Sequence, residues 1–572
     1  MAPNLDTVIS SHREIGNTNK VESTTKRYYG VINAAASIFT LFLLAYFTIQ
    51  LILNAGLLEK QIQNQVMKAT GDLYFIEIEN IDFSLTNRSF QASGISLRPN
   101  QPVLNALPQD SLPSYRYELD MSGFSLDGIN LVSYLRDNKI EMSSLQLRNP
   151  VISLIINQEL PGGNNQEEQQ GLEPLHARLA RQLPVIDVGD LSIDNATLAV
   201  EYRNNEERRK QIIEGLNLVF ENIKVDSLAA QNENRVLFSD NVTLMLDGFQ
   251  GESNDGIYQF DIGPVTASTR DSVFQIEDIS VLPTVSDVEF VEMKEVLASR
   301  YFFLCDSIKA EEIDYRNLLD HQDVIIGSIE VNNYLLDMFT DLSLPKYSLS
   351  QLPHETVRDL DMVLNIQEVS LNMGQINYAE QADGGLRPGF IFLDSTYVHV
   401  QNMTNVPELM NADNPAIISV QTFVNGEGAL EALIEMPLLD PDYPIYFSGE
   451  IGPVNAESLN SILVDLQGLN IQSGDVNSVI FDIQSTGSQA TGTVRADYEN
   501  LEIEVLEPRG YERDFAHELQ SFIANNLFLR SSGETAREGD VENEFDPAQD
   551  TFVNYLIFSL VDGLISSLVI LV

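Results

Sequence analysis

Few of the residue types that perform catalysis or bind metal ions are spaced in this sequence as that chemistry requires. The six histidines are scattered without metal-ligand spacing, and Cys305 is the single cysteine. The sequence contains no Gly-x-Ser-x-Gly turn, no glycine-rich phosphate loop and no His-Glu-x-x-His motif. Close carboxylate pairs such as Glu311-Glu312 are expected by number alone among 84 Asp and Glu residues. We therefore expect no enzymatic activity, no cofactor and no metal site.

The charge of the chain excludes one large class of partners. The formal net charge is −51 at pH 7. A nucleic-acid-binding face needs clustered Lys and Arg, so we expect no nucleic-acid partner. The same charge disfavours broad adhesion to anionic lipid headgroups.

The chemistry that the sequence does favour is apolar contact. From Gly71 to about Leu506, apolar residues alternate with polar ones, which is typical of half-buried strands. A sheet with one apolar face must cover that face, either by folding onto itself as a sandwich or barrel or by curving into a trough that holds acyl chains. The trough predicts about 25–30 strands at usual strand and loop lengths. Its candidate acyl-chain contacts are Ile76, Ile78, Leu145, Leu147, Leu216, Leu218, Phe220, Ile329, Val331, Ile480 and Ile483.

The strand region also repeats itself. Residues 73–155 align without a gap with residues 257–339, at a constant offset of 184 that pairs, for example, Tyr74 with Tyr258. A third, partial copy begins near Ile445. Repeats of such length predict a stacked architecture.

A short sequence pattern interrupts the alternation of apolar and polar residues at four places. In Ile78-Glu79-Asn80-Ile81 and its counterparts at 220–223, 276–279 and 498–501, two apolar residues fall three apart. That odd spacing moves the second residue to the other face of a regular strand. A β-bulge or sharp bend at the central pair would restore the face and curve the sheet, and a two-residue hairpin is the alternative.

An apolar stretch precedes the strands. Val31–Leu53 is 23 residues without a charge, roughly 34 Å as a helix, and it would cross a bilayer. Its spanning positions include Val31, Phe39, Leu43, Phe47 and Leu53. A cleaved signal peptide is the alternative, but that would have a shorter apolar core and a small-residue cleavage site. We expect an uncleaved anchor.

The chain ends on a second apolar stretch. In 552–572 the residues Ser559, Asp562, Gly563, Ser566 and Ser567 fall on one narrow polar stripe of an otherwise apolar helix. A second spanning helix is the alternative on length, but the stripe favours an amphipathic helix that docks on something. The apolar positions of this docking helix are Phe552, Leu556, Leu560, Leu564 and Leu568.

These patterns divide the chain into seven parts. The expected parts are a cytoplasmic tail at 1–27, the transmembrane anchor at 28–57, β-repeat units at 71–256 and 257–444, a partial third unit with a terminal helix at 445–530, an acidic linker at 531–550 and the apolar helix at 551–572. The fold class expected is mostly β: a transmembrane helix, a long curved antiparallel sheet built of repeats, and a C-terminal amphipathic helix.

Together these features resemble the AsmA-like family of bacterial envelope proteins, in the form common in Bacteroidetes-type bacteria. The resemblance rests on the anchor followed by the strand pair 74–85, the unit 125–149 with its copy 309–333, the segment 487–506 and the terminal Phe552-Val553-Asn554-Tyr555-Leu556. It implies a single-pass protein of the bacterial inner membrane with its bulk in the periplasm, which takes part in phospholipid transport and outer-membrane biogenesis. It also implies membrane lipids as partners, with an envelope protein at the C-terminal helix. A non-enzymatic structural or assembly scaffold of the envelope is the alternative.

Overall fold

The fold is described from a computed structural model. The structure describes residues 63–64, 66–68, 70–84, 86–108, 112, 115–137, 139–157, 185–203, 208–225, 235–253, 255–346, 349–381, 387–467, 469–506, 537–547 and 551–568. The expected tail and anchor up to residue 57 lie outside these residues. The described chain is mostly β and separates into two compact units. The N unit contains the described residues up to Gly251 together with Ile262–Phe274, and the C unit contains Glu252–Asp261 and everything from Gln275 onward.

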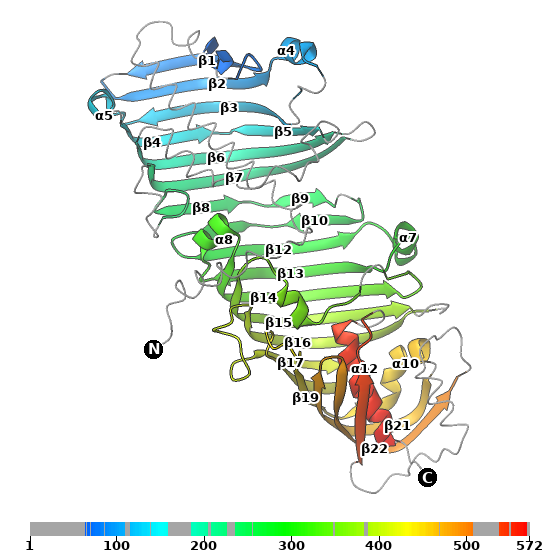
Figure 1. Cartoon of the computed structure of the whole chain (residues 1–572). Coiled ribbons are helices and arrows are strands. Elements are labelled where there is room, and N and C mark those ends of the chain that lie inside the picture. The colour runs from blue at the N-terminus through cyan, green and yellow to red at the C-terminus, as the bar shows by residue number, and fades with distance from the viewer. Residues whose placement is uncertain are drawn as a thin grey trace. The chain divides into compact units, whose positions relative to one another are not determined.

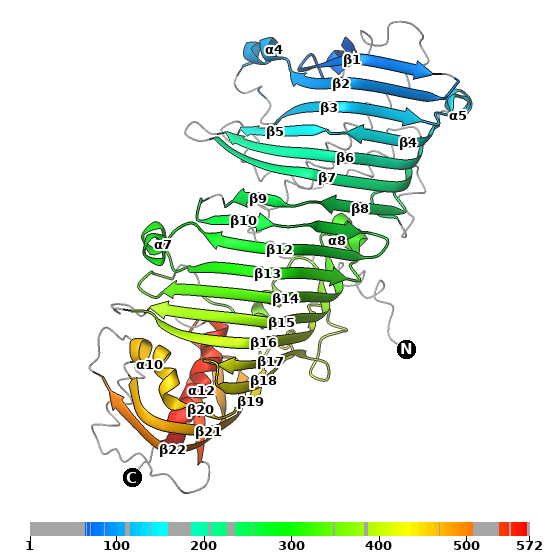
Figure 2. The same cartoon turned by 180° about the vertical axis from the view of Figure 1, so that it is seen from behind.

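In the N unit, strands lie side by side in one sheet (Figures 1 and 2). Its elements are β1 (Tyr74–Ser84), β2 (Ser89–Pro99), α4 (Gln101–Ala106), β3 (Tyr115–Asp127), α5 (Leu131–Asp137), β4 (Ile140–Arg148), β5 (Val151–Asn157), β6 (Ile186–Arg203), β7 (Arg208–Val225), β8 (Asn241–Leu246), β9 (Phe249–Glu252) and β11 (Val265–Ser268). β3 pairs with both β4 and β5, and both of these pair in parallel with β6.

The C unit carries the remaining strands and most of the described helices. Its elements are β10 (Tyr258–Ile262), β12 (Val273–Pro283), α7 (Asp287–Met293), β13 (Ser299–Glu311), α8 (Tyr315–His321), β14 (Val324–Asp341), α9 (Pro353–Arg358), β15 (Leu364–Gln381), β16 (Gly389–Thr404), β17 (Ala416–Val424), β18 (Gly428–Met436), β19 (Ile445–Ile451), β20 (Val454–Asn455), η4 (Ala456–Leu459), α10 (Asn460–Gln467), β21 (Leu469–Thr486), β22 (Gln489–Val505), β23 (Arg537–Glu544) and α12 (Phe552–Leu568). β14 and β15 are parallel, whereas β13–β14 and the pairs from β15 to β19 are antiparallel.

The sheet is mixed: most of its pairs are antiparallel, as expected, but some are parallel. The parallel pairs occur at equivalent places in the two units, where β4 and β5 meet β6 and where β14 meets β15. A parallel neighbour needs a crossover connection, and the chain between β14 and β15 supplies one that includes α9. The described chain has 23 strands, fewer than expected, because several of them continue for 18 residues.

The sequence repeat is matched by a repeat of elements. The bounds of β2, β3 and α5, each moved by 184 positions, give the bounds of β12, β13 and α8. Positions with a left-handed backbone conformation repeat as well: Asn149 (φ 48°) corresponds to Asn333 (φ 51°). One side-chain contact also repeats, since the Tyr74 hydroxyl accepts from the Tyr117 N–H at 3.2 Å and Tyr258 accepts from Tyr301 at the same distance.

The four interruptions of the alternation are not hairpins. At 498–501 the register against β21 shifts, as in a β-bulge. At 78–81 and 220–223 the register against β2 and β6 continues, so the strands bend there without an extra residue. Each lies inside a continuous strand, and Asn222, Asp278 and Asn500 have φ of 52°, 51° and 52°. Asn and Asp tolerate this left-handed conformation better than other side chains. At the first interruption the partner strand bends instead: Gly94 has φ 61°, and a Cβ there would meet the Glu79 side chain at 2.4 Å.

A ladder of polar side chains joins such positions across the N unit. Asn149 Nδ2 donates to Ser122 Oγ at 2.8 Å, and Asn195 Nδ2 donates to Asn149 Oδ1 at 2.9 Å. The Asn195 N–H donates to Asn217 Oδ1 at 2.9 Å. Asn195 itself has φ 52°. The ladder aligns the bends of β3 to β7.

Candidate functional site

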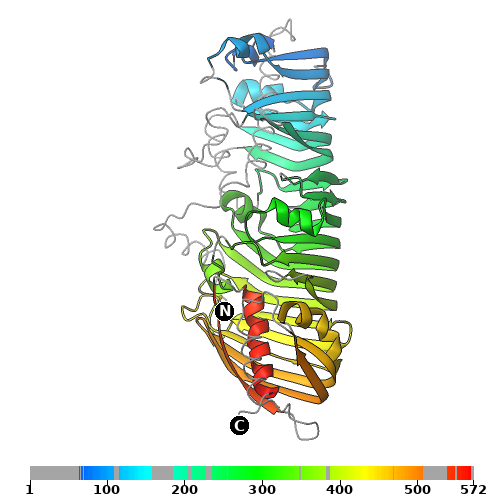
Figure 3. The same ribbon diagram turned by 90° about the vertical axis from the view of Figure 1, so that its right-hand side faces the viewer.

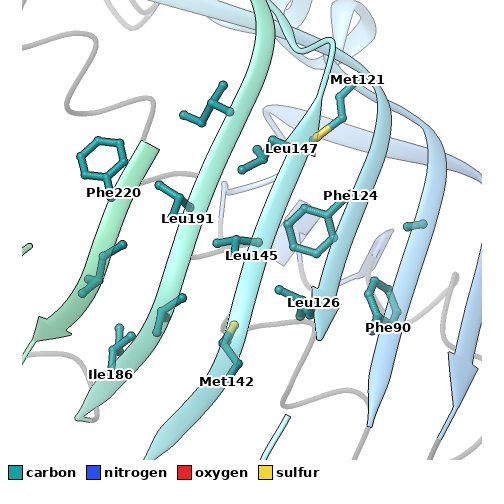
Figure 4. Packing of buried hydrophobic residues seen from close by; sticks show 14 of the residues in the cluster. Phe90, Met121, Phe124, Leu126, Met142, Leu145, Leu147, Ile186, Leu191 and Phe220 are labelled. Carbon is teal, nitrogen blue, oxygen red and sulfur yellow. The ribbon is translucent and has the colours of Figure 1, made fainter. Parts of the chain in front are cut away.

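Two neighbouring rows of apolar side chains cross the N unit at right angles to its strands. The first row is Phe83, Phe90, Leu126, Leu145, Leu191, Phe220 and Val242. The second row is Ile81, Ala92, Phe124, Leu147, Ile193, Leu218, Leu244 and Ala267. We call the face that carries these rows the inner face of the N unit. Figure 4 shows labelled members of both rows packed on adjacent strands.

The inner face of the N unit is a packed core. Leu145 is 1% exposed and Leu147 is 0% exposed, and both belong to a single cluster of buried residues. Of the other predicted contacts in this unit, Ile76, Ile78 and Phe220 are buried in the same cluster, and Leu216 and Leu218 pack against it.

The C unit has the same two rows. One row is Ala310, Ile329, Val369, Val400, Ile418, Ile434, Phe447 and Ile483. The other is Ile308, Val331, Leu371, Val398, Val420, Ala432, Gly449 and Phe481. We call this face the inner face of the C unit and the opposite one its outer face. The strand positions between these two rows face the other way. On β14 to β17 they place the polar residues Glu330, Ser370, His399 and Ser419 on the outer face.

Exposure distinguishes the rows of the C unit from those of the N unit. From β14 to β17 every member of both rows is half-buried, including the predicted contacts Ile329 and Val331. Farther along, Phe481 and Ile483 are buried in the cluster under α12. The C unit therefore presents an apolar face, four strands wide, that is only partly covered.

One predicted contact is on the wrong face. Val479, Phe481 and Ile483 are buried, whereas Ile480 lies between them on the outer face and pairs with Glu450 and Arg495. The strand is regular from Val479 onward, so a three-residue spacing places Ile480 and Ile483 on opposite sides.

Polar groups lie at one end of the inner face of the C unit. Ser299 Oγ and Thr340 Oγ1 are 2.7 Å apart, and the Tyr378 hydroxyl donates to the carboxylate of Glu380, a residue that is buried. Burial, the nearby Glu380 charge and this hydrogen bond together raise the pKa of Tyr378. We missed this cluster from the sequence, although Tyr378 and Glu380 occupy alternating positions that are apolar in the strands around them.

The C-terminal helix docks on its own chain. Tyr555 and Leu556 of α12 are buried, and Phe552, Leu560 and Leu564 pack against the same cluster of the C unit. Figure 3 shows α12, in red, crossing the strands at this end. The side chain of Leu568 lies outside the described residues.

The polar stripe of α12 binds the backbone of β23. Asp562 Oδ2 accepts from the Glu542 N–H at 2.7 Å, and Ser566 Oγ accepts from the Asp540 N–H at 3.0 Å. Burial raises the pKa of Asp562, against the effect of that hydrogen bond. Helix and strand approach closely: a Cβ on Gly539 would lie 2.2 Å from the Ser567 backbone nitrogen. The helix thus covers a strand edge that would otherwise offer free N–H groups.

β23 itself corrects a prediction. It lies within 531–550, which we expected to be an acidic linker. Its acidic residues alternate with Gly539, Val541 and Asn543, and only Val541 supplies a large apolar side chain, which is 1% exposed. The pattern was too weak to predict a strand without its partners β22 and α12.

No helix among the described residues is both long and apolar enough to span a bilayer. Within the same residues, no group of three or more His, Cys, Asp or Glu side chains is arranged to hold a metal ion.

No family model matches the chain, and no curated protein matches it. The resemblance to AsmA-like proteins therefore stays an expectation from the sequence.

Proposed function

We propose that the protein holds the acyl chains of membrane phospholipids on the inner face of the C unit, as an AsmA-like protein of the bacterial envelope. The observation that carries the proposal is the pair of half-buried apolar rows from β14 to β17. A partly covered apolar face of this regularity is typical of a binding surface.

Bulk apolar contact is sufficient for such binding. Burying a methylene contributes about 0.8 kcal/mol, so an acyl chain gains affinity from length without specific hydrogen bonds. The polar cluster around Ser299, Thr340 and Tyr378 lies at one end of the same face, where a headgroup would meet polar side chains.

Lipid extraction and mass spectrometry test the proposal. The full chain, purified from its membrane, should carry phospholipids in stoichiometric amount. Val331→Asp should remove them while the C unit stays folded, because Val331 is half-buried and a charge there is solvated. Leu304→Asp is the matched control: Leu304 is 36% exposed and lies on the outer face of the neighbouring strand β13.

Two outcomes would overturn the proposal. One is a purified protein free of lipid. The other is a Val331→Asp protein that is folded and that fully complements a deletion strain in an envelope-permeability assay.

The topology belongs to the same proposal. Val31–Leu53 would anchor the protein once in the inner membrane, with residues 71–572 in the periplasm and the transported lipids as partners. A phosphatase fused after Asp550 should then be active in the periplasm. Activity only for fusions placed before Tyr28 would reverse the topology.

A structural or assembly scaffold is the second candidate. The observation that favours it is the N unit, where the central members of the equivalent rows, from Phe90 to Leu191 and from Ala92 to Ile193, are buried in one cluster. An envelope protein partner would fit this function. Loss of envelope integrity on deletion, with no lipid bound to the purified protein, would support the scaffold over the carrier.

A further inference from the structure

A cleft of about 810 Å³ lies on the outer face of the C unit, away from the apolar rows. Its floor is formed by β13 to β16, where Arg300 aligns with Phe339, Ala379 and Phe390 in one row. Asp337, Asn377 and Phe392 form the next row on the same face. Asp287 of α7 lines one wall, and Ser458 of η4 and Ser461 of α10 line another.

The charged groups of the cleft are one cation, which is paired, and two carboxylates. Arg300 Nη1 lies 2.9 Å from Asp287 Oδ1, and Arg300 Nε donates to the Val285 carbonyl at 3.0 Å. Among the residues that the structure describes, Arg300 is the only basic one that lines the cleft, and the carboxylate of Asp337 lies on its floor. A phosphate or other anion would therefore meet one engaged cation and two carboxylates, which disfavours an anionic ligand.

The polar groups on the floor of the cleft are planar and lie together. Asn377 Nδ2 donates to Asp337 Oδ1, and Gln375 lines the floor beside them. Carboxylate and amide groups provide several acceptors and donors at fixed angles, which suit the adjacent hydroxyls of a polyol.

An aromatic side chain lies at the rim. Phe390 is 56% exposed although it is a large apolar residue that lines the cleft. Hydrogen bonds hold the wall that η4 and α10 form. The Phe392 N–H donates to Asn425 Oδ1 at 3.1 Å, and Asn425 Nδ2 donates to the Ser458 carbonyl at 2.8 Å. The cleft is thus preformed, as ligand sites of this size usually are.

We propose that this cleft binds a neutral saccharide. A pyranose ring has aliphatic C–H groups on one face and hydroxyls around its edge. Phe390 offers the apolar platform for the ring face, while Asp337, Asn377 and Gln375 offer hydrogen bonds to the hydroxyls. The site is separate from the acyl-chain face, so it stands whether or not the protein carries lipid.

An array of neutral oligosaccharides built from glucose, galactose, mannose and N-acetylglucosamine tests the proposal on the full chain. At least one should bind with a Kd of about 1 mM or tighter, as measured by titration calorimetry. Phe390→Ala and Asp337→Asn should each weaken that binding by about tenfold, because one removes the platform and the other a charged acceptor. Asp337→Asn preserves the shape of the side chain and guards against loss of folding.

Phe423→Ala is the matched control. Phe423 is 43% exposed on the outer face of β17 and does not line the cleft, so its loss should leave binding unchanged. The proposal fails if no oligosaccharide binds, or if both cleft variants bind as tightly as the wild type. It also fails if sulfated versions of the same sugars bind more tightly, since that would indicate an anion site.

Discussion

The N and C units place equivalent residues in the same register but use them differently. Leu145 and Leu147 of the N unit correspond to Ile329 and Val331 of the C unit. Leu145 and Ile329 lie in the first apolar row of their units, and Leu147 and Val331 lie in the second. In the N unit these positions are fully buried, whereas in the C unit they are half-buried.

The side chains along the rows differ in size. At four successive positions of the second row, the N unit has Phe124, Leu147, Ile193 and Leu218 where the C unit has Ile308, Val331, Leu371 and Val398. At three of these four positions the C unit has the smaller, β-branched side chain, and Ile193 and Leu371 are equal in size. Larger side chains fill a core at native packing density, whereas smaller ones keep the strand but fill less space. Strand register therefore sets which face is apolar, and side-chain volume contributes to whether that face is closed.

The largest effect expected is from a charge in the N unit. Leu147→Asp should unfold this unit, because an unpaired carboxylate in a fully buried site costs several kcal/mol. Hydrogen exchange of peptides from β3 to β6 should report the loss of protection. Val331→Asp, the equivalent change in the C unit, should leave protection there nearly intact. Equal losses in the two units would contradict the difference between them.

Truncating the same two side chains to alanine should show the same difference between the two units, with a smaller loss of stability. Leu147→Ala should lower the free energy of unfolding of the N unit by about 2–5 kcal/mol through transfer and cavity effects. Val331→Ala removes fewer atoms from a half-buried site and should cost about 1 kcal/mol. Denaturant titration followed by exchange of unit-specific peptides separates the two values. A larger cost at Val331 would mean that the C unit has the more tightly packed inner face.

Acid should destabilise the C unit in a way that one histidine explains. His354 of α9 is fully buried, and its burial lowers the pKa to about 4 from the ordinary 6.5. Between these values the unfolded chain binds a proton that the folded chain does not. The stabilisation is thus complete above about pH 6.5 and decreases toward pH 4, by about 3 kcal/mol at most.

The measurement is the free energy of unfolding of the C unit across this pH range. His354→Leu should remove the part of the slope that this residue causes, and the described residues of the N unit contain no histidine. A slope that persists unchanged in the variant would assign the pH dependence to other groups.

The smallest effect concerns two left-handed positions. Asn195 of the N unit (φ 52°) corresponds to Met373 of the C unit (φ 54°), and Met373 is 62% exposed. Asn favours this conformation and Met does not. Asn195→Met should therefore cost about 1 kcal/mol, and Met373→Asn should gain a few tenths of a kcal/mol. Melting temperatures should move in opposite directions, and a stabilising Asn195→Met would show that the ladder of polar side chains does not matter.

The sequence by itself determined the apolar rows. Alternation fixes which residues share a face, because successive side chains of a strand point to opposite sides. The ungapped repeat then places Ile329 and Val331 where Leu145 and Leu147 lie. It also located the four interruptions, although bulge and hairpin give the same spacing and only strand pairing distinguishes them.

The tertiary structure decided everything that depends on distant segments. Strand direction between β14 and β15 depends on the crossover through α9, which carries no alternating signal. The stripe on α12 predicted docking but not its partner, since the N–H groups of β23 belong to an acidic segment with one large apolar residue. The cleft on the outer face joins Asp287 to Ser461, so no local pattern contains it. Local periodicity is encoded in neighbouring residues, whereas these contacts arise only when packing brings remote ones together.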